Sequence, residues 1–134
     1  MKKNKLAKLS PRQSKHVAET NIVNKIGILE SWLRHGVPVE YEQGSAVRNN
    51  QGCVTLIYCP NSLRSFNTWN SNQYSDETKI KNINVCNISG NGTDTLNKYP
   101  VLKERVVYLL SAVDQVIKSQ ENTPLFEGQA HTSL

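Results

Sequence analysis

Residues Asn87–Lys118 carry the pattern that decides the fold, N-I-S-G-N-G-T-D-T-L-N-K-Y-P-V-L-K-E-R-V-V-Y-L-L-S-A-V-D-Q-V-I-K. After Pro100, apolar side chains recur at alternating spacings of four and three, which places them on one face of a helix. These residues are Leu102, Val106, Leu109, Val113 and Val116. Pro100 suits a first helical position, because a helix start leaves that N–H unpaired in any case. We therefore predict a long amphipathic helix over 100–118.

The half before Pro100 reads as a turn over 89–92 followed by a short polar helix over 93–99. Thr93 can cap that helix by accepting a hydrogen bond from a backbone N–H of its first turn. In small DNA-binding proteins, such a helix after a glycine-containing turn is often the one that enters the major groove. The segment Gly90-Asn91-Gly92 is either a plain turn or a backbone nest for a phosphate.

The basic charge of the chain is concentrated at its beginning. Six of the 16 lysines and arginines lie within the first fifteen residues, and no acid precedes Glu19. The remaining ten cations are balanced by 11 acids, so the rest of the chain is nearly neutral although the net charge is +5. Such an arm either neutralises DNA phosphates or only improves solubility. Its candidate phosphate contacts are Lys3, Lys5 and Lys8.

A chain of 134 residues is expected to form one domain. We predict a basic disordered arm over 1–13, a helix-rich domain over 14–119 and a flexible tail over 120–134. The first helix of that domain is predicted from Ser14 to His35. It has an apolar stripe and ends where Gly36 can cap it. The stripe consists of Ala18, Ile22, Ile26, Leu29 and Leu33.

Two segments rich in β-forming or alternating residues, 37–42 and 53–59, flank a loop full of turn residues. This pattern predicts an antiparallel hairpin. Its loop carries Arg48, so the hairpin is a candidate wing that contacts DNA, and an idle surface turn is the alternative.

Two shorter helices are expected between the hairpin and the turn. Residues 60–69 begin with helix-start chemistry and place Leu63, Phe66 and Trp69 toward one side. Residues 78–85 alternate lysines and isoleucines, which fits either a helix or a short strand, and we favour the helix. In that case residues 77–99 read as helix, turn, helix.

Enzymatic templates are missing from the sequence. No phosphate-binding loop, nucleophile elbow or H-E-x-x-H motif occurs, and three scattered histidines and three separate cysteines do not suggest a zinc site. No apolar run approaches the roughly 18 residues of a membrane span, and no secretory signal is evident. We expect a non-enzymatic protein without cofactor or metal, located in the bacterial cytoplasm near the nucleoid.

The segment I-S-x-N-x-x-D-T-L-N-K-Y-P-x-L-K-E-R-V resembles small helix-turn-helix accessory proteins encoded beside tyrosine recombinases in mobile elements. These are the transposase-C-like proteins of site-specific transposons and the gamma-mobile-trio accessory protein X. Cys59-Pro-Asn-Ser-Leu-Arg-Ser-Phe-Asn-Thr-Trp69 resembles the second group, and the resemblance covers residues 59–69 and 88–110. It implies DNA binding in support of recombination or transposition, with strand cutting by a separate tyrosine recombinase.

Carried across by this resemblance, the DNA-facing positions are Asn91, Thr93, Asp94, Asn97 and Lys98. The chain has Gly90 where the transposase-C-like proteins commonly have an arginine. Asp94 lies in a helix expected to approach phosphates, where it either accepts from a cytosine amino group or stabilises the helix start.

These observations predict a mainly α fold with a small β-hairpin, a helix-turn-helix-like domain with a candidate wing. It would bind double-stranded DNA without catalysis. Asn97 is the expected base reader, because its amide can pair bidentately with adenine. Alternatively, the helix over 100–118 dimerises or binds the recombinase, unless its apolar face covers the core of its own domain. The predicted DNA contacts are Lys79, Lys81, Asn91, Thr93, Asn97, Lys98, Arg48, Lys3, Lys5 and Lys8.

Overall fold

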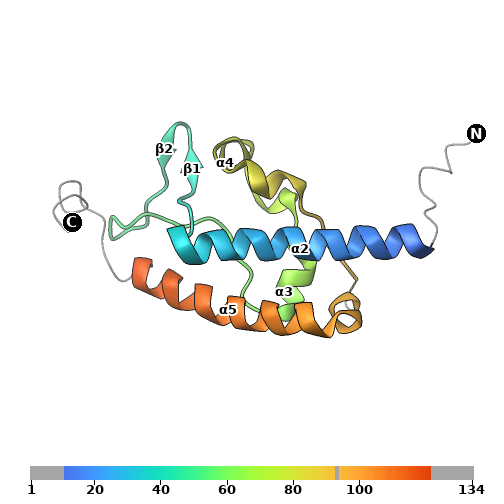
Figure 1. Ribbon diagram of the computed structural model, residues 1–134. Coiled ribbons are helices and arrows are strands. Elements are labelled where there is room, and N and C mark those ends of the chain that lie inside the picture. Colours follow the sequence, from blue (N-terminus) through green and yellow to red (C-terminus); the bar gives the residue numbers. More distant parts are fainter. Residues whose placement is uncertain (1–10, 93, 122–134) are drawn as a thin grey trace, which may run out of the picture.

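The computed structural model describes residues 11–92 and 94–121, with the side chains of 11–15 left aside, and it is mainly helical with a small antiparallel hairpin (Figure 1). The predicted fold class is confirmed at this level. No helix in the described part of the chain is long and apolar enough to cross a membrane. The elements are α2 (Pro11–His35), β1 (Tyr41–Glu42), β2 (Ser45–Ala46), α3 (Leu63–Thr68), η1 (Ser71–Gln73), α4 (Asp76–Lys81), η2 (Ile83–Asn87), η3 (Thr95–Lys98) and α5 (Pro100–Glu121).

The two long helices, α2 and α5, lie side by side and run in the same direction (Figure 1). In the last two turns of α2, Glu30 accepts a hydrogen bond from Arg105 Nη2 at 2.8 Å. Beyond the end of α2, the Gln120 side chain pairs with the backbone N–H and C=O of Val37 at 2.9 and 3.1 Å. Because the helices are parallel, residues 36–99 must return along the length of α2.

Both predicted helix stripes face the core. In α2, Ile22 and Leu29 have no exposed surface, and in α5 the same holds for Val106 and Leu109. The interpretation of the α5 stripe as the core of its own domain is thus confirmed. Gly36 adopts a φ of 91° and donates its N–H to Trp32 O at 2.8 Å, which confirms its role as the C-terminal cap of α2.

The helix predicted over 60–69 is present but begins at Leu63. Ser62 is its N-cap, and the side chains of Ser62 and Ser65 form a reciprocal capping box. Phe66 and Trp69 are fully buried, and the Trp69 ring lies 5.7 Å from that of Trp32. The predicted aromatic inner face is therefore confirmed.

The predicted hairpin segments pair at the bridge Val39–Leu56. The end of the first segment pairs with the start of the loop in a second, tighter hairpin that the sequence analysis did not anticipate. Its strands β1 and β2 are joined by Gln43 and Gly44, both with positive φ, a turn that matches strand twist.

Residues 78–85 are helical, as we favoured: α4 is capped by Ser75, and η2 follows it. The predicted helix over 93–99 is shorter than expected, a single 3₁₀ turn over Thr95–Lys98. The position before it belongs to Asp94, whose side chain makes no capping hydrogen bond. Asp94 thus stands at the helix start, as expected, but without a capping hydrogen bond, and Thr93, the predicted cap, lies outside the described residues.

The predicted helix-turn-helix order exists along the chain, but its two helices belong to different parts of the fold. α4 packs against η2 and β1, whereas η3 packs against α5. In Figure 1, α4 lies with the hairpin on one side of α2, and η3 lies on the other side. The predicted arm and tail fall almost wholly outside the described residues.

We expect substitution by alanine to change the free energy of unfolding in opposite directions at two glycines, one within α2 and one just after its end. Gly27 is helical, and a Cβ there would meet nothing within 4 Å, so Gly27→Ala should raise the free energy of unfolding by about 1 kcal/mol. At Gly36, φ is 91° and a Cβ would lie 3.4 Å from Gln120 Oε1, so Gly36→Ala should lower it by about 1–2 kcal/mol. Urea denaturation of both variants measures this. Equal shifts in the two variants would contradict the helix-end geometry.

Candidate functional site

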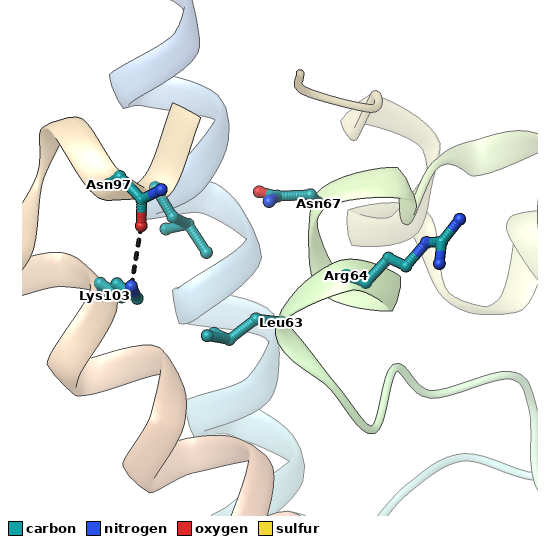
Figure 2. Close-up of a pocket in the computed structure, with 6 residues that line it drawn as sticks. Leu63, Arg64, Asn67, Asn97 and Lys103 are labelled. Carbon is teal, nitrogen blue, oxygen red and sulfur yellow. Dashed lines mark hydrogen bonds between the residues drawn. The ribbon is translucent and has the colours of Figure 1, made fainter. Parts of the chain in front are cut away.

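A pocket opens between α3, η3 and the first turn of α5, with a volume of ≈ 330 Å³ (Figure 2). We call it the α3–η3 pocket. Leu63 and the buried Leu96 supply its apolar surface, and no lining residue among those described is acidic. The lining residues are Leu63, Arg64, Asn67, Leu96, Asn97 and Lys103. In Figure 2, the Arg64 guanidinium points away from Asn97, so this cation lies toward the outside of the pocket.

Asn97 and Lys98 are exposed on η3, on the rim of this region. A hydrogen bond orients the Asn97 side chain: its Oδ1 accepts from Lys103 Nζ at 2.7 Å. An ammonium group has only donors, so the atom of Asn97 that faces it must be the oxygen. The Asn97 Nδ2 is therefore turned away from Lys103.

The turn before η3 is fixed to two helices. Asn21 of α2 donates its Nδ2 to Ser89 O at 2.5 Å and accepts from the Ser89 N–H at 3.2 Å. Asn91 accepts from Asn21 through Oδ1 at 3.2 Å and donates its backbone N–H to Asn67 O at 2.7 Å. A Cβ at Gly90 would lie 3.5 Å from that same oxygen, so the backbone of the turn sits against the end of α3.

This arrangement bears on the two interpretations of Gly90-Asn91-Gly92. A phosphate nest needs free backbone N–H groups, but the Asn91 N–H is used within the protein. Asn91 is also half-buried, and its amide points toward α2. These contacts favour a structural turn, in which the Asn91 side chain and backbone N–H form hydrogen bonds within the protein.

A buried lysine holds α3 in position. Lys25 of α2 has no exposed surface, and its Nζ donates to Phe66 O at 2.8 Å and to Asn67 O at 3.3 Å. The same Nζ lies 5.4 Å from the centre of the Phe66 ring. These carbonyls belong to the last turn of α3, where the helix dipole favours a cation. Burial lowers the pKa of Lys25 to about 8.

The remaining predicted contacts form a second group beside the hairpin. Lys79 lies 3.7 Å from Asp76, and the Lys81 ammonium lies 4.7 Å from the Tyr41 ring. Arg48 donates from Nη1 to Gly52 O at 2.7 Å, which ties it to its own turn. Glu77, whose Oε2 accepts from Gly44 N at 2.9 Å, places a carboxylate among these cations. This group lies with α4 and the hairpin, away from η3 (Figure 1).

The predicted site residues are thus only partly brought together. Asn97 and Lys98 share one exposed turn, and Lys103, which the sequence analysis missed, completes that site. Periodicity gives no signal for Lys103, since it pairs with Asn97 across the corner at Pro100. Lys3, Lys5 and Lys8 lie outside the described residues.

The state of a buried thiol and the placement of potential metal ligands bear on the chemistry open to the described residues. Burial raises the pKa of the Cys59 thiol to about 12, with a smaller contribution from Asp114, so this thiol stays protonated at neutral pH. Within residues 11–92 and 94–121, no cluster of three or more histidine, cysteine or acidic side chains could hold a metal ion.

Comparisons with protein-family models, with curated proteins and with solved structures gave no match.

The lowered pKa of Lys25 predicts that the free energy of unfolding rises with pH. The unfolded chain keeps the Lys25 proton up to about pH 10.5, whereas the folded chain releases it near pH 8. The unfolded state therefore binds more protons between these values, and the free energy of unfolding increases with pH. Relative to Lys25→Met, the native protein should gain about 1 kcal/mol between pH 8 and pH 9.

Urea denaturation of both proteins at these two pH values measures the difference. Cys59 and Tyr74, whose pKa values are raised by burial, are present in both proteins and cancel. Identical pH dependence in the two proteins would contradict a charged, buried Lys25.

Proposed function

We propose that this chain is a non-catalytic DNA-binding accessory or regulatory protein associated with a mobile genetic element. In this proposal a separate tyrosine recombinase performs the strand cutting. The observation that carries the DNA-binding part is the exposure of Asn97 and Lys98 on one turn beside Lys103, in a region whose pocket has no acidic lining residue among those described. The mobile-element part rests on the resemblance of residues 59–69 and 88–110.

The DNA-facing element in this proposal is η3, presented by the turn that Asn21 and α3 hold in place. With four residues, η3 is about 8 Å long, so it can offer only one or two side chains to a groove. Lys98 and Lys103 supply charge that phosphate binding requires. Helix-turn-helix-like docking would therefore use the tip of η3 rather than the length of a recognition helix.

In this proposal the basic arm contacts DNA at the same end of the molecule as η3. α2 begins at Pro11, at the end where η3 and the start of α5 lie (Figure 1). Lys3, Lys5 and Lys8 precede that point in the sequence. An arm attached there would reach phosphates that flank an η3 contact. Arg48, Lys79 and Lys81 lie with the hairpin and are left out of this interface.

The alternative function, binding of a protein partner through α5, is favoured by one observation. The core-facing stripe of α5 is buried and unavailable, but its outer face exposes Val101, Val107 and Tyr108 by 79%, 50% and 56%. Arg105 lies between them, with its guanidinium carbon 5.4 Å from the centre of the Tyr108 ring. A recombinase or a second copy of the chain would contact this face rather than the stripe.

DNA binding through η3 predicts a salt-dependent affinity that requires Lys98. Binding of a fluorescent duplex of about 30 base pairs, measured by anisotropy between about 50 and 200 mM salt, should weaken as salt increases. Lys98→Ala should lower the affinity and reduce the slope of log affinity against log salt by about one.

The matched control is Lys118→Ala, which removes an exposed lysine from the other end of α5, where it lies 3.2 Å from Asp114. This variant should bind like the native protein. An affinity indifferent to salt, or an equal loss in both variants, would overturn the proposed interface.

A further inference from the structure

Part of the apolar lining of the α3–η3 pocket belongs to a buried side chain. The walls of the pocket come from α3, η3 and the first turn of α5, and its apolar surface includes Leu96, which is only 2% exposed. A base within a duplex presents only its edge to a protein, so it cannot reach an apolar surface set back in a pocket. A base that has left the stack presents its face as well.

We propose that this pocket binds one unpaired guanine, taken from single-stranded DNA or from an opened duplex. The proposal deepens, and rests on, the proposed DNA binding through η3. The base would lie against Leu63 and Leu96, with its O6 and N7 toward Asn97 and Lys103 (Figure 2). A volume of ≈ 330 Å³ lies within the range of pockets that hold small ligands.

The choice of guanine follows from the hydrogen bond between Asn97 and Lys103. Lys103 Nζ donates to Asn97 Oδ1 at 2.7 Å, which leaves the Asn97 Nδ2 and the remaining ammonium hydrogens as donors. The pair therefore recognises a ligand edge made of acceptors. Guanine presents two adjacent acceptors, N7 and O6, whereas adenine presents an acceptor and a donor.

This arrangement revises the expected role of Asn97. Bidentate pairing with adenine would need its Oδ1 to accept from the adenine amino group. That oxygen is already engaged by Lys103. Asn97 stays the base reader, but the base it fits is guanine.

The α3 side of the pocket leaves the donor groups of Asn97 and Lys103 accessible to a base. Asn67 lines the opposite side of the pocket from α3, and in Figure 2 its side chain extends toward the η3 side. Arg64, beside it, is exposed and turns its guanidinium outward. The space between Asn67 and Asn97 is thus bordered by amides and Leu63, and Lys103 supplies a positive charge beside Asn97.

The test uses the full chain and short oligothymidylates of about 12 nucleotides with one central substitution: guanine, 7-deazaguanine or adenine. Anisotropy should show the guanine oligonucleotide binding at least about fivefold more tightly than the adenine one. 7-Deazaguanine, which lacks the N7 acceptor, should lose most of that preference. Asn97→Leu and Lys103→Met should abolish it, whereas Lys118→Ala should retain it.

The outcomes separate this inference from the function on which it rests. Equal affinity for all three oligonucleotides, with salt-dependent duplex binding intact, would overturn the guanine pocket alone. Absence of binding to both duplex and single strands would overturn the proposed function.

A guanine preference that survives in Asn97→Leu and Lys103→Met would assign the recognition elsewhere and overturn the pocket as its site. Asn97 is exposed, so its variant should fold; unchanged thermal unfolding of both variants verifies that any loss is local.

Discussion

The parallel arrangement of α2 and α5 is the constraint from which the rest of the structure follows. Helices that run in the same direction cannot be joined by a short turn, so the chain must return over roughly the 37 Å length of the 25-residue α2. The return segment contains the hairpin, α3, α4 and the 3₁₀ turns. It fills the space beside the two helices with Phe66, Trp69 and Tyr74 instead of leaving a two-helix bundle.

Polar side chains of α2 then fix the return segment at defined points. Lys25 reaches the carbonyls at the end of α3, and Asn21 pairs with the backbone of Ser89. A buried ammonium without a carboxylate partner is costly, which the lowered pKa of Lys25 reflects. Its hydrogen bonds to the end of α3 offset part of that cost. The two α2 residues lie one helical turn apart, so one face of α2 positions both α3 and the turn that leads to η3.

The candidate site is a consequence of that positioning. α3 is held on one side and η3 on the other, and α5 begins at Pro100 directly after η3, so a pocket remains between them. The corner at Pro100 brings Lys103 to Asn97 and makes their shared face a donor surface. A similar polar turn without Lys103 would leave the Asn97 amide able to present either of its two groups.

The sequence by itself determined the local elements: the core stripes of α2 and α5, the cap at Gly36, and the aromatic face of α3. Periodicity and capping chemistry act within a few residues, so they are readable along the chain. Only the tertiary structure decided that α4 and η3 lie apart, that Asn91 faces inward, and that Asn97 pairs with Lys103. Those outcomes depend on the direction of two helices 64 residues apart in the chain, which no local pattern records.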